Sequence, residues 1–472
     1  MRSGSPTQPN RDEVADPLPP LAAAQGDERI IAYDFARLFI GPIFHTPRGI
    51  DRVDLAMARH LFSTDESPHM GIIPMPWGIR AFSAQAIRRW LELLESLWAE
   101  NCDIDQDQQL RHLVARLAAP RLPTGSEQAE NPAPTHLPAL SRRQKIGRML
   151  RHVSASGIGL GQSAAAAVPQ KAIYLNIGQL GLAVPFFHHW LDGRRDLTRA
   201  MMLHDAIPLE VPHLVPPGAD AHHARMVRTA ARFADCLIFS SDCAQASVNK
   251  AMGELAQIRL PATVRPLPLP QAFCDIDTSL PDLAEVHYFI AVSTIELRKN
   301  YELLLRVWAR LIARMGAYAP HLIIVGSPGF GAEKILAPLD TNPGLRQHIH
   351  IISGLSSPAL SKLVLGASAM LCPSFTEGFG LPVLEANAMG VPTIASDIAA
   401  HREVGTMGTR YLDCDDDLAW EAAVFAMPRA GMRARPHIPA RLTEANYCAD
   451  IVKFVQNFSK TEQRQQIFGG NA

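Results

Sequence analysis

The sequence predicts an α/β fold built from two domains, and three observations support this prediction. The chain has 472 residues, 47% of them hydrophobic, which is too long for one ordinary domain and apolar enough for two cores. In the C-terminal half, short apolar segments near residues 287, 321, 348, 369 and 392 alternate with helical patterns, as in a parallel sheet. Loops rich in glycine and charge follow two of these segments, and in parallel sheets such loops form the ligand crevice.

The order of segments along the chain gives the domain boundaries. A run of prolines within 260–281 predicts the linker between the two domains. We therefore expect a polar, disordered tail over 1–28, a first domain over 29–275, a second domain over 282–440, and a C-terminal helix and tail over 441–472.

The overall composition argues against several classes of protein. Lys and Arg number 45 and Asp and Glu number 46, so the net charge of −1 gives no general attraction to nucleic acid. Seven scattered cysteines without a C-x-x-C pair argue against a disulfide framework or a zinc site. The longest apolar stretch, 172–187, contains polar residues and a proline and is too short to span a bilayer. We expect a cytoplasmic protein, either soluble or peripheral on the inner face of the membrane.

The most informative segment is 373–386, with the sequence PSFTEGFGLPVLEA. The apolar residues 369–372 before it predict a short buried strand. Pro382 suits the first turn of a helix, which the pattern continues to Met389. The residues between strand and helix therefore form a loop at the edge of the sheet where ligands bind.

This loop has the groups that a nucleotide-sugar requires. Gly378 and Gly380 allow close approach of the backbone, and the free N–H groups at the helix start can bind a diphosphate. Glu377 and Glu385 can accept hydrogen bonds from the hydroxyls of a sugar and of a ribose. Two glutamates at this spacing are weak evidence by themselves, since one can be a solvated loop residue and the other can complement the helix dipole.

The complete string Ser-Phe-x-Glu-Gly-Phe-Gly-Leu-Pro-x-Leu-Glu-Ala is stronger evidence, because it resembles the donor-site signature of retaining glycosyltransferases of family 4. The resemblance implies the GT-B fold, in which two Rossmann-like domains face each other across a cleft. It implies that the donor lies against Gly378, Phe379, Gly380 and Leu381 and binds Glu385, and that Glu377 is catalytic.

A basic pair after the strand expected near 287 extends the resemblance. Arg298 and Lys299 match the Arg-Lys-Asn pattern of the family, which implies that they bind the donor diphosphate; the alternative is a pair of solvated surface charges. Asn300 is expected to cap the following helix. Many members carry Gly-Arg where this chain has Ser293 and Thr294, a substitution similar to that of a branch that builds bacterial capsules, exopolysaccharides and O-antigens, often from mannose.

Two positions in the first domain complete the resemblance. His204 follows an apolar strand expected over 200–203 and resembles the family's cleft histidine, which implies a catalytic position; a structural, hydrogen-bonded histidine is the alternative. Gly49 belongs to a loop similar to the Gly-Ile-x-Arg-Val loop of the same branch, which implies contact with the donor phosphates. Arg52 in that loop either contacts the donor or braces the loop.

Two further segments have expected roles. The resemblance implies that a last helix over 443–458 crosses back to the first domain. The basic run 141–153 forms an amphipathic, cationic helix if it is helical, and it either contacts an anionic inner-membrane surface or docks on the first domain. An irregular segment rich in Pro, Gln and Ala over 119–140 interrupts the first domain.

Together the resemblance implies transfer of a hexose, with mannose from GDP-mannose as the best candidate, and with retention of configuration. The acceptor would be a polyprenyl-diphosphate-linked saccharide or a growing surface polysaccharide, and no cofactor or metal would be needed. Two alternatives remain: a GT-B sugar-nucleotide epimerase, and an inactive scaffold that only binds nucleotide-sugar. An epimerase is not expected to carry this glutamate string with an upstream Arg-Lys-Asn.

Overall fold

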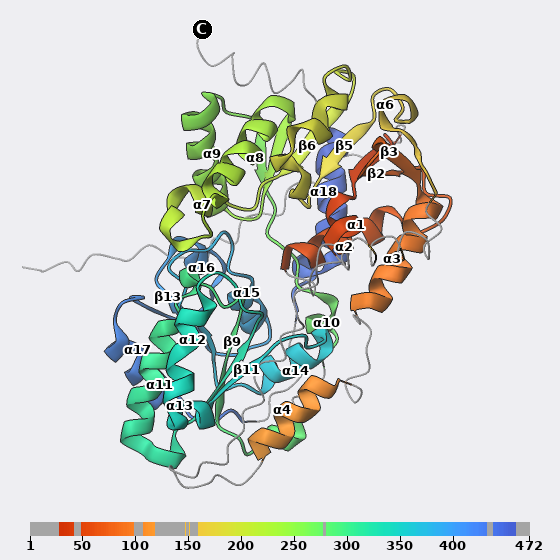
Figure 1. Ribbon diagram of the computed structural model, residues 1–472. Coiled ribbons are helices and arrows are strands. Elements are labelled where there is room, and N and C mark those ends of the chain that lie inside the picture. The colour runs from red at the N-terminus through yellow and green to blue at the C-terminus, as the bar shows by residue number, and fades with distance from the viewer. Residues whose placement is uncertain are drawn as a thin grey trace, which may run out of the picture.

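The computed structural model of the protein describes residues 28–41, 49–98, 107–118, 147, 151, 159–276, 280–431 and 438–458 (Figure 1). The expected disordered tail lies outside the described residues except for Glu28. The irregular segment 119–140 also lies outside them, as does the basic run 141–153 apart from Gly147 and Arg151.

The first sheet has eight strands in the order β4-β3-β2-β1-β5-β6-β7-β8. The neighbouring strands β2, β1, β5, β6, β7 and β8 pair in parallel, in that order across the sheet. Strand β3 pairs antiparallel with both β2 and β4. The central strands are apolar and buried along nearly their whole length, as expected for a sheet covered on both faces. The strands are β1 Ile31–Asp34, β2 Met70–Met75, β3 Gly78–Ser83, β4 Gln162–Ser163, β5 Ile173–Asn176, β6 Thr198–Met202, β7 Cys236–Phe239 and β8 Ala262–Val264.

The second sheet has six strands, all parallel, in the order β11-β10-β9-β12-β13-β14. The strand order reverses between β9 and β12, so the loops after these two strands open at the topological switch point of a doubly wound sheet. The strands are β9 Tyr288–Val292, β10 His321–Val325, β11 Ile349–Ile352, β12 Met370–Cys372, β13 Thr393–Ser396 and β14 Thr409–Leu412.

Helices cover both faces of each sheet, and four clusters of apolar side chains are buried between the helices and the sheets. Alternation along β1 shows the two faces: Ile31 and Tyr33 enter one cluster and Ala32 enters another. The helices are α1 Ala36–Ile40, α2 Gly49–Leu61, α3 Ala84–Trp98, α4 Gln108–Ala118, α6 Ala164–Ala167, α7 Ile207–Glu210, α8 Ala219–Phe233, α9 Asp242–Ala256, α10 Gln271–Cys274, α11 Tyr301–Met315, α12 Ala332–Thr341, α13 Pro343–His348, α14 Ser357–Gly366, α15 Leu381–Ala388, α16 Ala399–Val404, α17 Asp417–Ala426 and α18 Glu444–Asn457.

The α/β fold class is confirmed, and two doubly wound sheets in one chain are the arrangement expected of a GT-B fold (Figure 1). We call the part of the molecule around the first sheet the first half and the part around the second sheet the second half. All five strands expected in the second half are present, within one or two residues of the expected positions. Part of the expected linker, Ala262–Val264, instead forms β8 at the edge of the first sheet.

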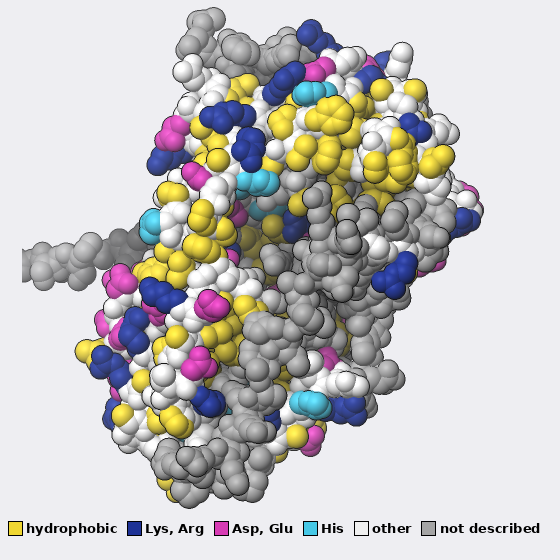
Figure 2. Space-filling model, in the orientation of Figure 1, with side chains coloured by type: hydrophobic (Ala, Val, Ile, Leu, Met, Phe, Trp, Pro, Cys, Tyr) yellow, Lys and Arg dark blue, Asp and Glu magenta, His cyan; other side chains and the backbone are white. Residues whose placement is uncertain are grey.

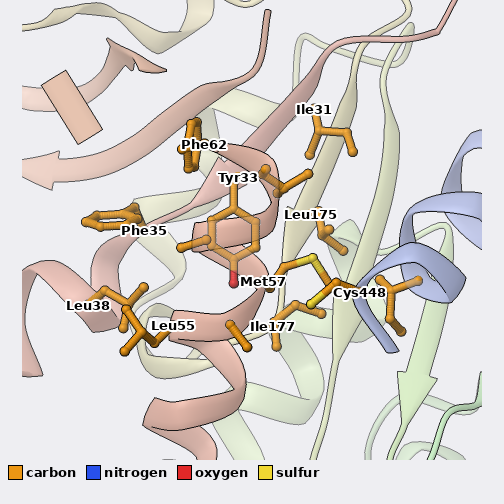
Figure 3. Close-up of a cluster of buried hydrophobic side chains, with 14 of the residues drawn as sticks. Ile31, Tyr33, Phe35, Leu38, Leu55, Met57, Phe62, Leu175, Ile177 and Cys448 are labelled. Atoms are coloured by element: carbon orange, nitrogen blue, oxygen red, sulfur yellow. The ribbon is translucent and has the colours of Figure 1, made fainter. Parts of the chain in front are cut away.

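The last helix, α18, packs in the first half although it follows the second sheet in the chain (Figure 1). Tyr447, Cys448 and Ile451 are buried against β1 and α2, and Figure 3 shows Cys448 beside Tyr33 and Met57. The side chain of Gln456 accepts a hydrogen bond from the backbone N–H of Arg29 at 3.1 Å and donates one to its carbonyl at 2.8 Å. The C-terminal helix therefore forms part of the core of the first half.

Helix α4 makes the opposite crossing. It comes from the range expected for the first domain, yet Leu110, Leu113 and Leu117 are buried in the apolar cluster beneath β9 and α14. The carboxylate of Asp107 accepts a hydrogen bond from the backbone N–H of Ser356 at 2.9 Å. The helical pattern of this segment predicts an apolar face but not the sheet that the face covers.

Truncation of Ile451 tests the contribution of α18. Ile451 is fully buried, so Ile451→Ala should lower the unfolding free energy by about 2–5 kcal/mol through lost burial and the cavity left behind. Lys453→Ala, an exposed position on the same helix, serves as the control and should change the thermal midpoint little. Equal midpoints for the two variants in thermal unfolding would contradict this packing.

Candidate functional site

The candidate site lies where the loops after β9 and β12 run side by side at the switch point of the second sheet. The backbone N–H of Phe375 donates to the carbonyl of Arg298 at 2.9 Å, which joins the two loops directly. Figure 2 shows the surface hollowed between the two halves at this level, with histidine and charged side chains around the hollow. Sequence reasoning placed Arg298 and Glu377 on separate loops, and the structure brings them together.

Glu377 forms a buried ion-pair network with both predicted cations. Its carboxylate accepts hydrogen bonds from Lys299, from Arg298 at 3.1 Å and from the hydroxyl of Ser374 at 2.8 Å. Burial alone would raise the pKa of Glu377, but Lys299 and Arg298 outweigh it and hold the pKa well below its usual value. Glu296 gives Arg298 a second carboxylate at 2.7 Å.

The two cations respond differently to this environment. Burial lowers the pKa of Lys299, and the neighbouring Arg298 lowers it further. Burial opposes the charge of Arg298 as well, but Glu377 and Glu296 outweigh it and raise the pKa of Arg298. Glu377 therefore compensates two buried cations that would otherwise repel each other.

The turn before α15 presents free backbone donors. Among the described residues, no protein acceptor faces the backbone N–H groups of 376–381. Gly380 has φ of 94°, which glycine adopts without strain and which turns the chain into the helix. Consecutive free N–H groups at a helix start bind anions, so this turn can hold a phosphate beside Arg298 and Lys299.

The same turn contacts the first half at Gly378. A Cβ atom at this position would lie 2.7 Å from the carbonyl oxygen of His204 and 2.9 Å from the Cβ of Asp205. The carbonyl of Gly378 accepts a hydrogen bond from the hydroxyl of Ser241 at 2.6 Å. Glycine at position 378 therefore allows the close approach of the two halves of the molecule.

Glu385 is buried on α15, and one of its carboxyl oxygens makes no hydrogen bond. Its side chain is 2% exposed, and its Oε1 has no hydrogen-bond partner in the structure. Burial raises its pKa to about 7, although the positive charge of Arg52 opposes the shift. A buried carboxyl that lacks a partner is costly in a folded protein and is typical of a ligand site.

His204 lies on the opposite wall, directly after β6. Its Nε2 donates to the carbonyl of Ile177 at 3.1 Å, and its backbone N–H donates to the side chain of Gln179 at 3.2 Å. Burial lowers the pKa of His204 to about 4, so the ring is neutral at neutral pH. Because Nε2 carries the proton, Nδ1 is an acceptor, and it has no hydrogen-bond partner in the structure.

Gly49 is the first residue of α2 and lies against the start of α15. A Cβ atom at position 49 would be 3.1 Å from Cδ2 of Leu381, so the two predicted residues are neighbours across the halves. Asp51, in the first turn of α2, forms an ion pair with Arg37 at 2.6 Å. The positive charge of Arg52 acts on the carboxyl of Glu385 and lowers its pKa against the effect of burial.

The prediction that the side chain of Asn300 caps the following helix is wrong. Asn300 precedes α11 but has a left-handed backbone with φ of 54°, and its side chain makes no capping bond. The side-chain amide instead donates to the carbonyl of Cys414 at 2.9 Å, which ties the basic loop to the loop after β14. Ser293, at the position of the family's Gly-Arg, forms a hydrogen bond with the hydroxyl of Tyr301 at 2.7 Å.

Sequence reasoning missed several residues that shape the site. Ser241 and Gln179 come from loops of the first half and contact Gly378 and His204. Neither residue lies in a motif, so only the tertiary contact reveals it. Gln179 has a left-handed backbone with φ of 49°, a strained conformation that no local pattern indicated.

The described residues contain one group of side chains close enough to share a metal ion, namely Asp413, Cys414 and Asp415. This group lies in the acidic run before α17, and the adjacent Asp416 caps that helix by accepting a hydrogen bond from Ala419 at 2.9 Å. None of the helices in the described part of the chain has both the length and the apolar character needed to cross a membrane.

Residues 280–426, which contain both loops of the candidate site, match the family model "Glycosyl transferases group 1". Residues 280–426 form a glycosyl transferases group 1 domain. The domain comprises the second sheet and helices α11 to α17, including α15 with Glu385.

Relatives of this chain include bacterial proteins that are named as mannosyltransferases. The serotype-specific mannosyltransferase WbdA of Escherichia coli is 28% identical over 220 residues, covering 43% of this chain and 26% of that protein. The O-antigen chain mannosyltransferase RfbU of Salmonella typhimurium is 32% identical over 142 residues, covering 29% of this chain and 37% of that protein. The matched regions thus span about a quarter to a third of these relatives.

Solved structures show a distant likeness over more of the chain. An α,α-trehalose 6-phosphate synthase from Burkholderia multivorans is 13% identical with a TM-score of 0.44, covering 70% of this chain and 78% of that one. A sucrose-phosphate synthase from Thermosynechococcus elongatus is 17% identical with a TM-score of 0.42, covering 70% and 80%.

A side chain at position 378 should destabilise the protein. Gly378→Ala places a methyl group against His204 and Asp205, so we expect a loss of about 1–3 kcal/mol in unfolding free energy. Gly253→Ala is the control, because Gly253 lies in α9 with open space around it and alanine favours the helix. Denaturant unfolding that shows no difference between the two variants would contradict the close approach.

The raised pKa of Glu385 predicts a pH-dependent stability effect. Its folded pKa of about 7 exceeds the ordinary value of 4.5, so its stabilising contribution is complete below about pH 4.5 and is lost as the pH rises to about 7. Glu385→Gln should therefore raise the unfolding free energy at pH 8, by roughly 3 kcal/mol at most, and change it little at pH 5. The exposed Glu333→Gln is the control, and an equal effect of Glu385→Gln at both pH values would contradict the burial argument.

Proposed function

We propose that the protein is a retaining glycosyltransferase that transfers a hexose from a nucleoside-diphosphate sugar to a saccharide acceptor. The observation that carries this proposal is the combination of free N–H groups at 376–381 with the adjacent cations Arg298 and Lys299 and the uncompensated carboxyl of Glu385. One end of this arrangement suits a diphosphate and the other suits a diol. A nucleoside-diphosphate sugar has both groups in one molecule.

The diphosphate would take over part of the role that Glu377 has in this structure. Glu377 now compensates Arg298 and Lys299, and a bound diphosphate would supply negative charge to the same cations. This would release acceptor capacity on Glu377 for a sugar hydroxyl. As the bond to the sugar breaks, negative charge grows on the leaving diphosphate, and fixed cations and N–H groups stabilise that charge.

His204 would contact the sugar as a neutral acceptor. Its Nε2 proton is committed to Ile177, so only the lone pair of Nδ1 is available, and a hydroxyl is the matching group. The low pKa of about 4 argues against a role as a cation for phosphate. In the proposed reaction His204 therefore orients the donor sugar, and the leaving phosphate removes the proton of the acceptor hydroxyl on the same face.

The proposed donor is GDP-mannose, and the proposed acceptor is a lipid-linked saccharide or growing surface polysaccharide. The support is that WbdA and RfbU, which resemble part of this chain, bear mannosyltransferase names, and that of RfbU refers to the O-antigen chain. We propose that no metal takes part, since Arg298, Lys299 and the N–H groups supply the positive charge that phosphate requires. Contact with the inner face of the membrane is part of this proposal, because a lipid-linked acceptor lies there.

A binding screen tests the proposed function. Purified protein is titrated by calorimetry with GDP-mannose, UDP-glucose, UDP-N-acetylglucosamine and their free diphosphates. We expect one donor to bind, and we expect Glu385→Ala to weaken its binding at least about tenfold because the bonds to the diol are lost. The exposed Glu333→Ala on α12 should bind like the wild type.

Turnover separates the enzyme from the two alternatives. Release of the nucleoside diphosphate that depends on an added saccharide acceptor supports a transferase. An epimerase would change the sugar without acceptor, and a scaffold would bind donor without turnover. If no nucleotide binds, or if Glu385→Ala binds as the wild type does, the proposed function is wrong.

A further inference from the structure

The start of helix α9 in the first half holds one peptide of the donor loop in the second half. Ser241 precedes α9, is fully buried, and lies with its hydroxyl oxygen 2.6 Å from the carbonyl oxygen of Gly378. The same hydroxyl caps the helix by accepting from the backbone N–H of Ala244 at 2.9 Å. One side chain thus belongs both to the helix cap and to the contact between the halves.

The direction of each bond follows from the groups involved. The N–H of Ala244 can only donate, and the carbonyl of Gly378 can only accept. The single hydroxyl proton of Ser241 must therefore point at Gly378. Because Ser241 is buried, water does not offer that carbonyl an equivalent donor from this side.

Fixing the carbonyl of Gly378 also fixes the next N–H group. A trans peptide is planar, and its N–H points opposite to its C=O. The N–H of Phe379 is therefore directed away from Ser241, and it is one of the free donors of 376–381. Gly378 has no Cβ atom to restrict its backbone angles, so this peptide can rotate about the Gly378 side unless something holds it.

A second contact ties the same helix end to the second half. The backbone N–H groups of Asp242 and Cys243 donate to the carboxylate of Glu403 on α16, at 2.7 and 3.2 Å. Both contacts join elements of different halves, so they exist only while the halves are together. The orientation of the Gly378 peptide is thereby linked to the approach of the halves.

We infer that Ser241 is a positioning residue that orients the Gly378–Phe379 peptide for the diphosphate of the donor, and does so only when the two halves are closed together. This inference rests on the proposed function, because it assigns the anion to the N–H groups of the donor loop. It adds that Ser241 of the first half takes part in binding the diphosphate without touching it. The loop is complete only when both halves meet.

Calorimetric titration with free GDP and free UDP tests the inference. Ser241→Ala loses the bond to Gly378 and should bind the diphosphate that the wild type prefers about 3–10-fold more weakly, the value of one hydrogen bond. Ser241→Thr keeps a hydroxyl in the capping position and should restore binding. Ser356→Ala is the matched control, since Ser356 caps α14 through Ala359 and makes no contact with the donor loop.

The outcomes are distinct. Both alanine variants lose a helix cap and should lower the thermal midpoint by similar amounts, whereas only Ser241→Ala should lose affinity. Binding by Ser241→Ala within twofold of the wild type, or an equal loss in Ser356→Ala, overturns the role of Ser241 alone. Failure of the wild type to bind either diphosphate overturns the proposed function itself. If Ser241→Ala does not fold, Ser241→Cys replaces it under the same criteria, since a thiol is a weaker donor.

Discussion

The buried carboxylate of Glu377 is the constraint on which the candidate site depends. It holds Arg298 and Lys299, two adjacent cations from the loop after β9, against the loop after β12. Without an anion between them, two buried cations would repel each other and lose solvation, a penalty of several kcal/mol. The same need for negative charge makes the pair suitable for a diphosphate. The stability of these two loops and the suitability of the pair for a diphosphate thus depend on the same electrostatic requirement.

The second sheet could be predicted in some detail because its strands are short, apolar and separated by amphipathic helices. β14 escaped prediction because Thr409–Leu412 is an edge strand whose residues are only partly buried, so its pattern lacks an apolar run. The position of α4 could not be foreseen either. An apolar stripe on a helix indicates that the helix packs, but both sheets offer apolar surfaces, and only the tertiary structure decides between them.

In the candidate site, too, some features could be predicted from the sequence and others could not. The glycines, cations and glutamates that follow β9 and β12 could be identified because parallel strands bring such loops to one edge of the sheet. The ion pairs of Glu377, the missing partner of Glu385 and the tautomer of His204 depend on atoms from distant loops, so no pattern encodes them. Ser241 is the clearest case, since a serine before a helix predicts a cap and gives no sign of a second bond to Gly378.

The connections between the two halves, which include the crossing helices α4 and α18, constrain how the halves can move relative to each other. The connection after β8 and the return segment before α18 run side by side, joined by the hydrogen bond from the N–H of Leu269 to the carbonyl of Leu442 at 2.8 Å. These two paired segments connect the halves. Helix α4 forms a third link, anchored in the second half by Leu113 and its neighbours. Two paired segments and a separate link through α4 should let the halves rotate through a limited arc without sliding past each other. The loop after β12 should therefore meet Ser241 in the same register at every closure.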